Sequence, residues 1–184
     1  MQGIDASLTH WINAAAGHSP LLDATMIAVA TWGVPLLVLL VAVQWWRRSA
    51  DRAADRHILV AAGLSFLLGL GINQLILLLV HRVRPYDAGV THLTVAPSAD
   101  PSFPSDHATA AVAIAVAFLL HGATRRGGAF LVAACVIALS RVFIGIHYVG
   151  DTIGGAATAL IAALVVRQVY RRGTWIDRFV TGIL

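Results

Sequence analysis

Two short segments of this 184-residue chain carry serine, histidine, arginine and aspartate at spacings that suit phosphoryl chemistry. Ser105 and His107 lie in the segment SADPSFPSDHA, and Arg141, His147 and Asp151 lie in the segment SRVFIGIHYVGD. Guanidinium groups bind phosphate oxygens in bidentate fashion, and two histidines can divide the roles of nucleophile and general acid. These residue types predict a phosphate-handling site if the fold brings the two segments together.

The local spacing of these residues indicates further roles for their side chains. Asp151 follows His147 by four residues, so on one helical turn its carboxylate can orient the imidazole and stabilise its charged form. Ser105 follows Pro104 at the start of an apolar run, where free backbone N–H groups and the helix dipole favour an anion. Arg141 lies within an apolar stretch, and a buried arginine in a membrane helix is a functional candidate.

The composition identifies the elements that must position these residues. The chain is 58% hydrophobic and 12% charged, whereas soluble domains carry about 25% charged residues. A soluble globular protein and a disordered chain are therefore excluded. The single cysteine, Cys135, also excludes disulfide and Cys-rich zinc frameworks.

A membrane helix needs about 20 apolar residues, and the chain has several apolar runs of this length. These runs predict an all-α, polytopic membrane helix bundle in one domain, residues 1–184. Five spans are predicted at 24–46, 58–80, 108–124, 127–140 with a continuation past Arg141, and 152–166. A short N-terminal interfacial helix is predicted from the helical spacing of Ile4, Leu8, Trp11, Ile12 and Ala15. The tail 175–184 fits either a cytoplasmic interfacial helix or ordinary packing.

The positions of the thirteen arginines predict the orientation. Five spans place ten of them on one face, which the positive-inside rule makes cytoplasmic: Arg47, Arg48, Arg52, Arg56, Arg125, Arg126, Arg167, Arg171, Arg172 and Arg178. Only Arg82, Arg84 and Arg141 lie on the outer face, together with the four helix ends that carry the candidate site. The net charge of +4 thus reflects membrane orientation, and no nucleic-acid partner is expected.

Other interpretations compete with a phosphate site. Asp151 could be a helix N-cap, and Arg82 and Arg84 could contact lipid headgroups. A metal site could be formed by His107, His147, Asp106 and Asp151, although the arginines would repel a cation. A non-enzymatic channel or transporter would use the glycine-rich stretches 69–73 and 150–155 for helix packing. His10, His18, His57 and His121 have no role in any of these hypotheses.

The motifs resemble those of the type 2 phosphatidic acid phosphatase superfamily over residues 58–166. The third motif of that family is complete in Ser140, Arg141, His147 and Asp151, and the second reads Pro104, Ser105, Asp106 and His107 with aspartate in the glycine place. The first motif keeps Arg84-Pro85, but Leu77 stands where the family has lysine. The segments INQLILLLVHRVRPY and ADPSFPSDH are similar to bacterial undecaprenyl-diphosphate phosphatases of the bacitracin-resistance type.

The resemblance implies a role for each matching residue. His147 would attack the terminal phosphorus, Asp151 would hold its tautomer, and His107 would act as general acid and then activate water. Arg84, Ser105 and Arg141 would bind the phosphoryl oxygens. Arg82 is the candidate to replace the missing lysine, and Asp106 and Ser140 are candidates for a supporting role. The resemblance implies neither a metal nor a cofactor.

The expected function is hydrolysis of undecaprenyl or another polyprenyl diphosphate to the monophosphate at the outer face of a bacterial plasma membrane, in lipid-carrier recycling. The expected partners are this lipid substrate and the surrounding membrane lipids. The alternative substrates are phosphatidylglycerophosphate, phosphatidic acid and a prenyl-linked sugar phosphate. The sequence leaves the prenyl chain length and the oligomeric state open.

Overall fold

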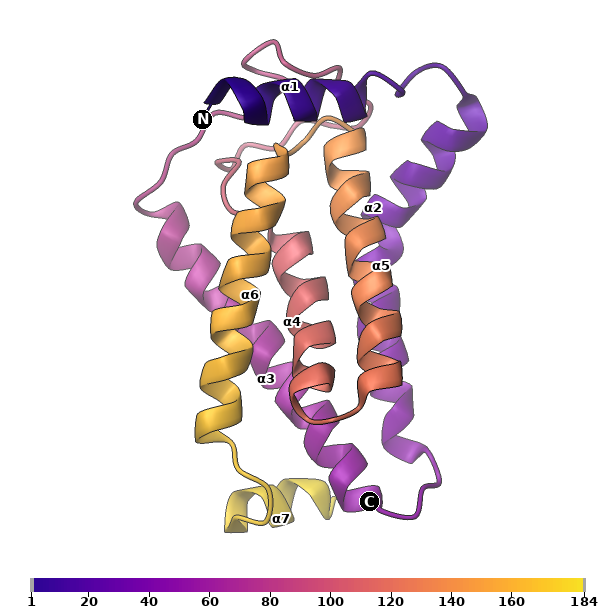
Figure 1. Cartoon of the computed structure of the whole chain (residues 1–184), viewed down its shortest axis with the longest axis vertical. Coiled ribbons are helices and arrows are strands. Elements are labelled where there is room, and N and C mark those ends of the chain that lie inside the picture. Colours follow the sequence, from indigo (N-terminus) through magenta and orange to yellow (C-terminus); the bar gives the residue numbers. More distant parts are fainter. Residues whose placement is uncertain (1, 184) are drawn as a thin grey trace.

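The computed structural model describes residues 2–183, and this part of the chain is helical without any strand (Figure 1). The elements are α1 (Gln2–Asn13), α2 (Pro20–Ala42), the 3₁₀ helix η1 (Val43–Trp46), α3 (Arg52–Leu77), α4 (Asp106–Leu120), α5 (Thr124–Phe143), α6 (Val149–Val169) and α7 (Trp175–Thr181). The predicted all-α helix bundle is confirmed.

In the described part of the chain, four segments are long and apolar enough to cross a membrane, namely α2 with η1, α3, α5 and α6. The third predicted span is helical but shorter than predicted, because α4 has only 15 residues. A helix of that length measures about 22 Å, less than the hydrocarbon core of about 30 Å. It ends at Leu120, and Gly122 at a φ of +80° makes the turn into α5 where the prediction continued to Thr124.

Helix α4 lies in the middle of the bundle and packs against α3, α5 and α6 (Figure 1). Its sequence is rich in alanine, and small side chains let neighbouring helices approach closely. The buried alanines are Ala108, Ala110, Ala111, Ala113, Ala115 and Ala117. Because α4 is covered by protein rather than by lipid, it does not have to match the thickness of a bilayer.

Helix α1 lies across one end of the bundle, which we call the α1 end (Figure 1). The predicted N-terminal helix is therefore present, with Ile4, Leu8 and Trp11 exposed and with Thr9 and Asn13 buried. The Asn13 side chain donates to the carbonyls of His92, at 2.9 Å, and Phe143, at 2.7 Å, and accepts from the His92 N–H at 2.7 Å. It thereby fastens the loop 78–105 to the end of α5.

Helix α7 lies at the opposite end, which we call the α7 end (Figure 1). Asp177 Oδ1 accepts hydrogen bonds from His57 Nδ1 and from the Tyr170 hydroxyl, both at 2.8 Å. Burial raises the pKa of Asp177, but the Gly173 N–H, His57 and Tyr170 together lower it by more, so the carboxylate is ionised. His57, which had no role in the sequence hypotheses, thus holds the C-terminal helix against α3.

The tail places its apolar side chains outward. Trp175, Ile176 and Phe179 are exposed, and Leu184 lies outside the described residues. The ten arginines predicted to share one face belong to the η1–α3 connection, the start of α3, the start of α5, the end of α6, the α6–α7 connection and α7, all at the α7 end (Figure 1).

Two helices end earlier than the sequence predicted, and both ends lie beside the candidate site. Helix α3 ends at Leu77 rather than near Val80, and α5 ends at Phe143 rather than continuing toward α6. Gly145 turns the chain after α5 at a φ of +83°, and a Cβ there would lie 2.4 Å from the His92 carbonyl oxygen. The residues that follow each helix are therefore free to form loops around a cavity.

Gly155 permits the contact between α4 and α6 that supports the candidate site. An added Cβ would lie 2.6 Å from the Ser105 carbonyl oxygen and 2.8 Å from Thr109 Oγ1. We expect Gly155→Ala to lower the free energy of unfolding by about 1–3 kcal/mol, the usual effect of overpacking. Thermal unfolding of detergent-purified protein measures this change.

The matched control is Gly71→Ala on α3, where an added Cβ meets nothing within 4 Å. Because alanine is the better helix former, this variant is expected to unfold at the wild-type temperature or slightly above it. Equal unfolding temperatures for the two variants would show that the contact at Gly155 is not tight.

Candidate active site

A cavity of about 220 Å³ with a mostly polar lining lies at the α1 end of the bundle. Five predicted site residues line it: Arg84, Asp106, His107, Arg141 and His147. The other lining residues are Gln74, Leu77, Ser98, Asp100, Pro101 and Pro104. The lining residues come from α3, α4 and α5 and from the loops after α3 and α5. These segments therefore converge, as the span count predicted.

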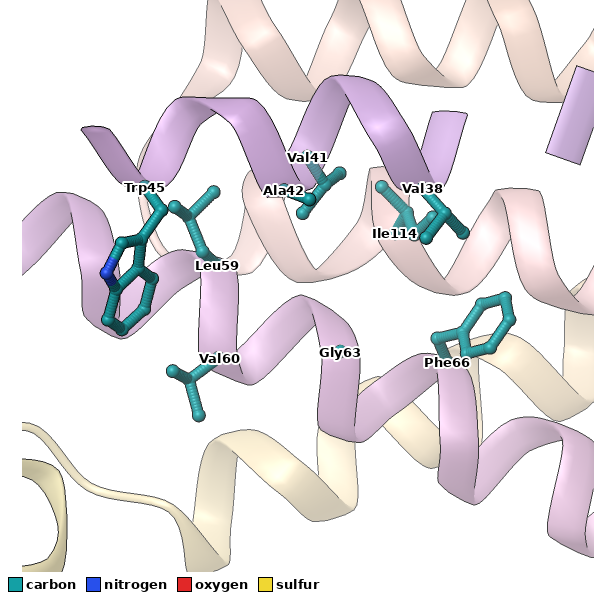
Figure 2. A pocket seen from close by; sticks show the side chains of 9 residues that line it. All are labelled: Val38, Val41, Ala42, Trp45, Leu59, Val60, Gly63, Phe66 and Ile114. Atoms are coloured by element: carbon teal, nitrogen blue, oxygen red, sulfur yellow. The ribbon is translucent and has the colours of Figure 1, made fainter. Parts of the chain in front are cut away.

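A second cavity has a different chemical character. It has about 240 Å³ and lies between α2, η1, α3 and α4. Figure 2 shows its nine lining residues, among them Trp45, Val60 and Phe66, and none of the nine has a titratable side chain. Of these two cavities, only the polar one has side chains that suit phosphate chemistry.

His147 is buried in the loop between α5 and α6, and its Nδ1 lies 2.8 Å from the Ser102 carbonyl oxygen. A carbonyl oxygen can only accept, so Nδ1 carries the proton and Nε2 keeps its lone pair. Burial lowers the pKa of His147, the contact with Asp151 raises it, and Arg141 and Arg84 lower it, with a net decrease. The ring is thus neutral at neutral pH, as a nucleophile requires.

Asp151 is fully buried in the first turn of α6. Its Oδ2 accepts from the Ser102 hydroxyl at 2.5 Å and the Tyr148 N–H at 2.8 Å, while its Oδ1 accepts from Arg82 at 2.7 Å. The distance from His147 Nδ1 to Asp151 Oδ2 is 3.5 Å. The carboxylate therefore acts on the imidazole largely through Ser102.

Ser102 was missed in the sequence analysis, although it lies three residues before Ser105. Its hydroxyl donates to Asp151 and its carbonyl accepts from His147, so it joins the two predicted residues. His147 is not on a helical turn with Asp151, because α6 begins at Val149. The four-residue spacing predicted their proximity but not the residue between them.

Arg84 and Arg141 bring positive charge to the cavity without a carboxylate partner within 4 Å in the described chain. Arg84 donates to the carbonyls of Asp100 at 2.8 Å and Ile146 at 2.9 Å, and to Ser98 Oγ at 3.1 Å. These neutral acceptors fix the guanidinium and leave its charge uncompensated. Arg141 donates to the Ala30 carbonyl at 3.3 Å.

Three buried polar atoms in this region lack a hydrogen-bond partner among residues 2–183: the donors Arg141 Nε and Ser105 Oγ, and the acceptor Asn73 Oδ1. Ser105 precedes α4, and its neighbours Pro104 and Asp106 line the cavity, although Ser105 itself does not. An unpaired buried donor is destabilising. Arg141 Nε and the Ser105 hydroxyl are therefore suited to an oxyanion that supplies the missing acceptors.

Arg82 does not line this cavity. It lies on the other side of Asp151, where it forms ion pairs with Asp151 at 2.7 Å and with Asp5 of α1 at 2.6 Å. Its guanidinium carbon is 3.9 Å from the centre of the Tyr148 ring. The structure therefore does not place Arg82 where the missing lysine would reach. Leu77 and Gln74 line the cavity at that place.

Asp106 lines the cavity and accepts a hydrogen bond from Asn73 Nδ2 at 2.7 Å. Asn73 also donates to Thr109, so it ties α3 to the start of α4. Ser140 does not reach the cavity, since its hydroxyl donates to the Ile137 carbonyl within α5. The described residues contain no group of three or more His, Cys, Asp or Glu side chains arranged to hold a metal ion.

Residues 58–175 match the PAP2 superfamily. The chain belongs to this superfamily. The expected family is thus confirmed, and its members' phosphatase chemistry agrees with a cavity that holds two histidines and two unpaired arginines. The matched region begins in α3 and ends at the first residue of α7, so it includes every lining residue of the polar cavity.

Two curated relatives of this PAP2 protein are named as undecaprenyl-diphosphatases, whereas a third, from Bacillus licheniformis, is named bacitracin transport permease protein BcrC and is 27% identical over 159 residues, which cover 85% of this chain and 75% of that protein. Undecaprenyl-diphosphatase BcrC of Bacillus subtilis is 31% identical over 150 residues, which cover 82% of this chain and 76% of that protein. The putative undecaprenyl-diphosphatase YbjG of Escherichia coli is 29% identical over 172 residues, which cover 93% and 85% of the two chains.

Two crystal structures share the fold. A PAP2-type phosphatidylglycerolphosphate phosphatase from Bacillus subtilis has a TM-score of 0.65 at 19% identity, with 95% of this chain and 88% of that chain covered. Aquifex aeolicus LpxE has a TM-score of 0.65 at 23% identity, with 88% and 93% covered. This PAP2 chain is therefore a multi-pass membrane protein of the phosphatase fold.

Ser102 provides a test of the geometry around His147. Ser102→Ala keeps the carbonyl but removes the hydrogen bond to Asp151, and a bond to a charged group contributes about 1.5–3 kcal/mol. We expect kcat for phosphate release to fall at least about tenfold with little change in KM. Ser7→Ala on the exposed face of α1 is the control. Wild-type kcat in Ser102→Ala would contradict the bridging role.

Proposed function

We propose that this PAP2 protein removes the terminal phosphate of undecaprenyl or a related polyprenyl diphosphate and leaves the lipid monophosphate. One observation carries the proposal. A single cavity contains a neutral His147 with a free Nε2, and it also contains Arg84 and Arg141, which have no carboxylate partners in the described chain. The names of two of the curated relatives support the diphosphate as substrate.

In the first step, His147 Nε2 attacks the terminal phosphorus. An N–P bond forms while the bond between that phosphorus and the bridging oxygen breaks, and His107 donates its proton to the leaving lipid monophosphate. The His107 ring suits this task because it lines the cavity and, within residues 2–183, has no hydrogen-bond partner that would hold its proton.

In the second step, His107 takes a proton from water, and the resulting hydroxide attacks the phosphohistidine. The N–P bond breaks, inorganic phosphate leaves, and His147 returns to its neutral form. The Nδ1–H of His147 stays on the Ser102 carbonyl in both steps, and the Asp151 carboxylate stabilises the positive charge that the ring carries when phosphorylated.

The transferring phosphoryl group carries its charge on three equatorial oxygens, where cationic donors act most strongly. Arg84 is held ready by neutral acceptors, and Arg141 Nε and the Ser105 hydroxyl gain the partners that they lack. The N-terminus of α4 points its dipole to the same place. These four features support binding of the phosphoryl group without a metal.

The cavity is proposed to face the outside of a bacterial plasma membrane, in agreement with a role in recycling a cell-wall lipid carrier. Ten arginines lie at the α7 end, and arginine-rich ends of membrane helices are cytoplasmic. The α1 end, with the cavity, is then on the outer side.

The deciding experiment is phosphate release by detergent-purified protein in excess chelator. Undecaprenyl diphosphate is compared with phosphatidylglycerophosphate, phosphatidic acid and a prenyl-linked sugar phosphate by kcat/KM, with His147→Ala as the blank. We expect chelator-resistant release that is strongest on the prenyl diphosphate and undetectable in the blank. Preference for a glycerolipid or the sugar phosphate would overturn the substrate, and release lost to chelator would overturn the metal-free mechanism.

His107 is tested through the leaving group. We expect His107→Ala to lower kcat for the lipid by about 10²–10⁴-fold, the usual contribution of general acid catalysis. A p-nitrophenyl phosphate ester needs little protonation as it leaves, so the same substitution should reduce its phosphoenzyme formation much less. The burst of nitrophenol measures this step. Equal losses on both substrates would refute the general-acid role.

A further inference from the structure

Arg82 joins two carboxylates that lie far apart in the sequence. One terminal nitrogen of its guanidinium is 2.7 Å from Asp151 Oδ1, and the other is 2.6 Å from Asp5 Oδ2. The Asp151 side chain is fully buried, the Asp5 side chain is 19% exposed, and the Arg82 side chain is 27% exposed. Arg82 therefore reaches from the surface to the carboxylate beside the nucleophile.

Helix α1 adds two contacts with the same part of the fold. Asp5 Oδ1 accepts from the Gly150 N–H at 2.8 Å, and Thr9 Oγ1 accepts from the Val149 N–H at 3.1 Å. The first N–H groups of a helix have no partner within that helix, so α1 caps the first turn of α6, which carries Asp151. A Cβ at Gly150 would lie 2.6 Å from Asp5 Oδ2, so a side chain there would displace the Asp5 carboxylate from this position.

The charge of Arg82 is needed where it lies. A buried carboxylate without a paired charge is strongly destabilised. The other partners of Asp151 are the Ser102 hydroxyl, the Tyr148 N–H and the His147 ring, which are neutral. Arg82 is thus the cation that permits an ionised Asp151, and Asp5 fixes the plane of its guanidinium from the opposite side.

We propose that Asp5 and Arg82 are positioning residues of the active site, which act on His147 through Asp151 and Ser102 and do not touch the substrate. The inference rests on the proposed role of His147 as nucleophile. It makes α1 a part of the catalytic apparatus, although this helix lies outside the segment 58–175 that matches the family.

The principal variant is Asp5→Asn, which keeps the shape and an acceptor for the Gly150 N–H but removes the charge that holds Arg82. Arg82→Lys keeps a cation but loses the planar fork, and Arg82→Gln removes the cation. The control is Asp87→Asn, an exposed residue of the loop after α3 with no contact to the site. Thermal unfolding shows whether each variant is folded.

We expect Asp5→Asn and Arg82→Lys to lower kcat about tenfold, as loss of an orienting partner does, with KM within twofold of wild type. Arg82→Gln and the double variant Asp5→Asn/Arg82→Gln should have equal activity, because the two residues act in series. Unchanged kcat in Asp5→Asn, or an equal loss in Asp87→Asn, would overturn the proposal. A raised KM with wild-type kcat would instead make Arg82 a phosphate ligand.

A second readout needs no turnover. The charged and titratable groups around His147 are Asp151, Arg84, Arg141 and His107. Loss of the Arg82 cation leaves the Asp151 charge less compensated, so the pKa of His147 should rise in Arg82→Gln and remain unchanged in Asp87→Asn. Histidine NMR measures it, with the signal assigned by its loss in His147→Ala. An unchanged His147 pKa would refute the coupling even if wild type released no phosphate.

Discussion

A fully buried carboxylate, Asp151, is the constraint on which the α1 end of the bundle depends. Burying it is favourable only if every oxygen is paired, and its partners come from the loop before α4, the start of α6 and the segment after α3. Ser102, Tyr148 and Arg82 are consequently fixed in place by one side chain. The same arrangement holds His147 in the tautomer that leaves Nε2 free.

The other half of the site has the opposite electrostatic character. Arg84 and Arg141 are held by carbonyl oxygens and not by carboxylates, so their charges repel each other across the cavity. Such an arrangement is tolerated when an anion relieves the repulsion, and a diphosphate group supplies more negative charge than a single phosphate. The neighbouring Asp106 is drawn toward Asn73, which limits its repulsion of the same anion.

Much of this arrangement could be predicted from the sequence, for a physical reason. Apolar runs fix which helix ends share a membrane face, so Arg84, His107, Arg141 and His147 were expected at one membrane level. The role of Ser102 could not be predicted in this way, since its carbonyl is a group that every residue has. Arg82 was assigned to phosphate as a replacement for the missing lysine. Its pairing with Asp5 could not be foreseen, because Asp5 lies 77 positions away on a helix predicted only to rest on the membrane.

The shortness of α4 has a consequence for how a lipid reaches the cavity. A helix of 15 residues falls about 8 Å short of the hydrocarbon thickness, so His107 at its start lies below the end of a full-length span. Gln74 and Leu77 of α3 form the cavity wall beside it, and the adjoining Leu78 and Leu79 are 72% and 83% exposed. The tail of a lipid substrate therefore remains dissolved among acyl chains while its head group enters the cavity sideways, without being lifted into water.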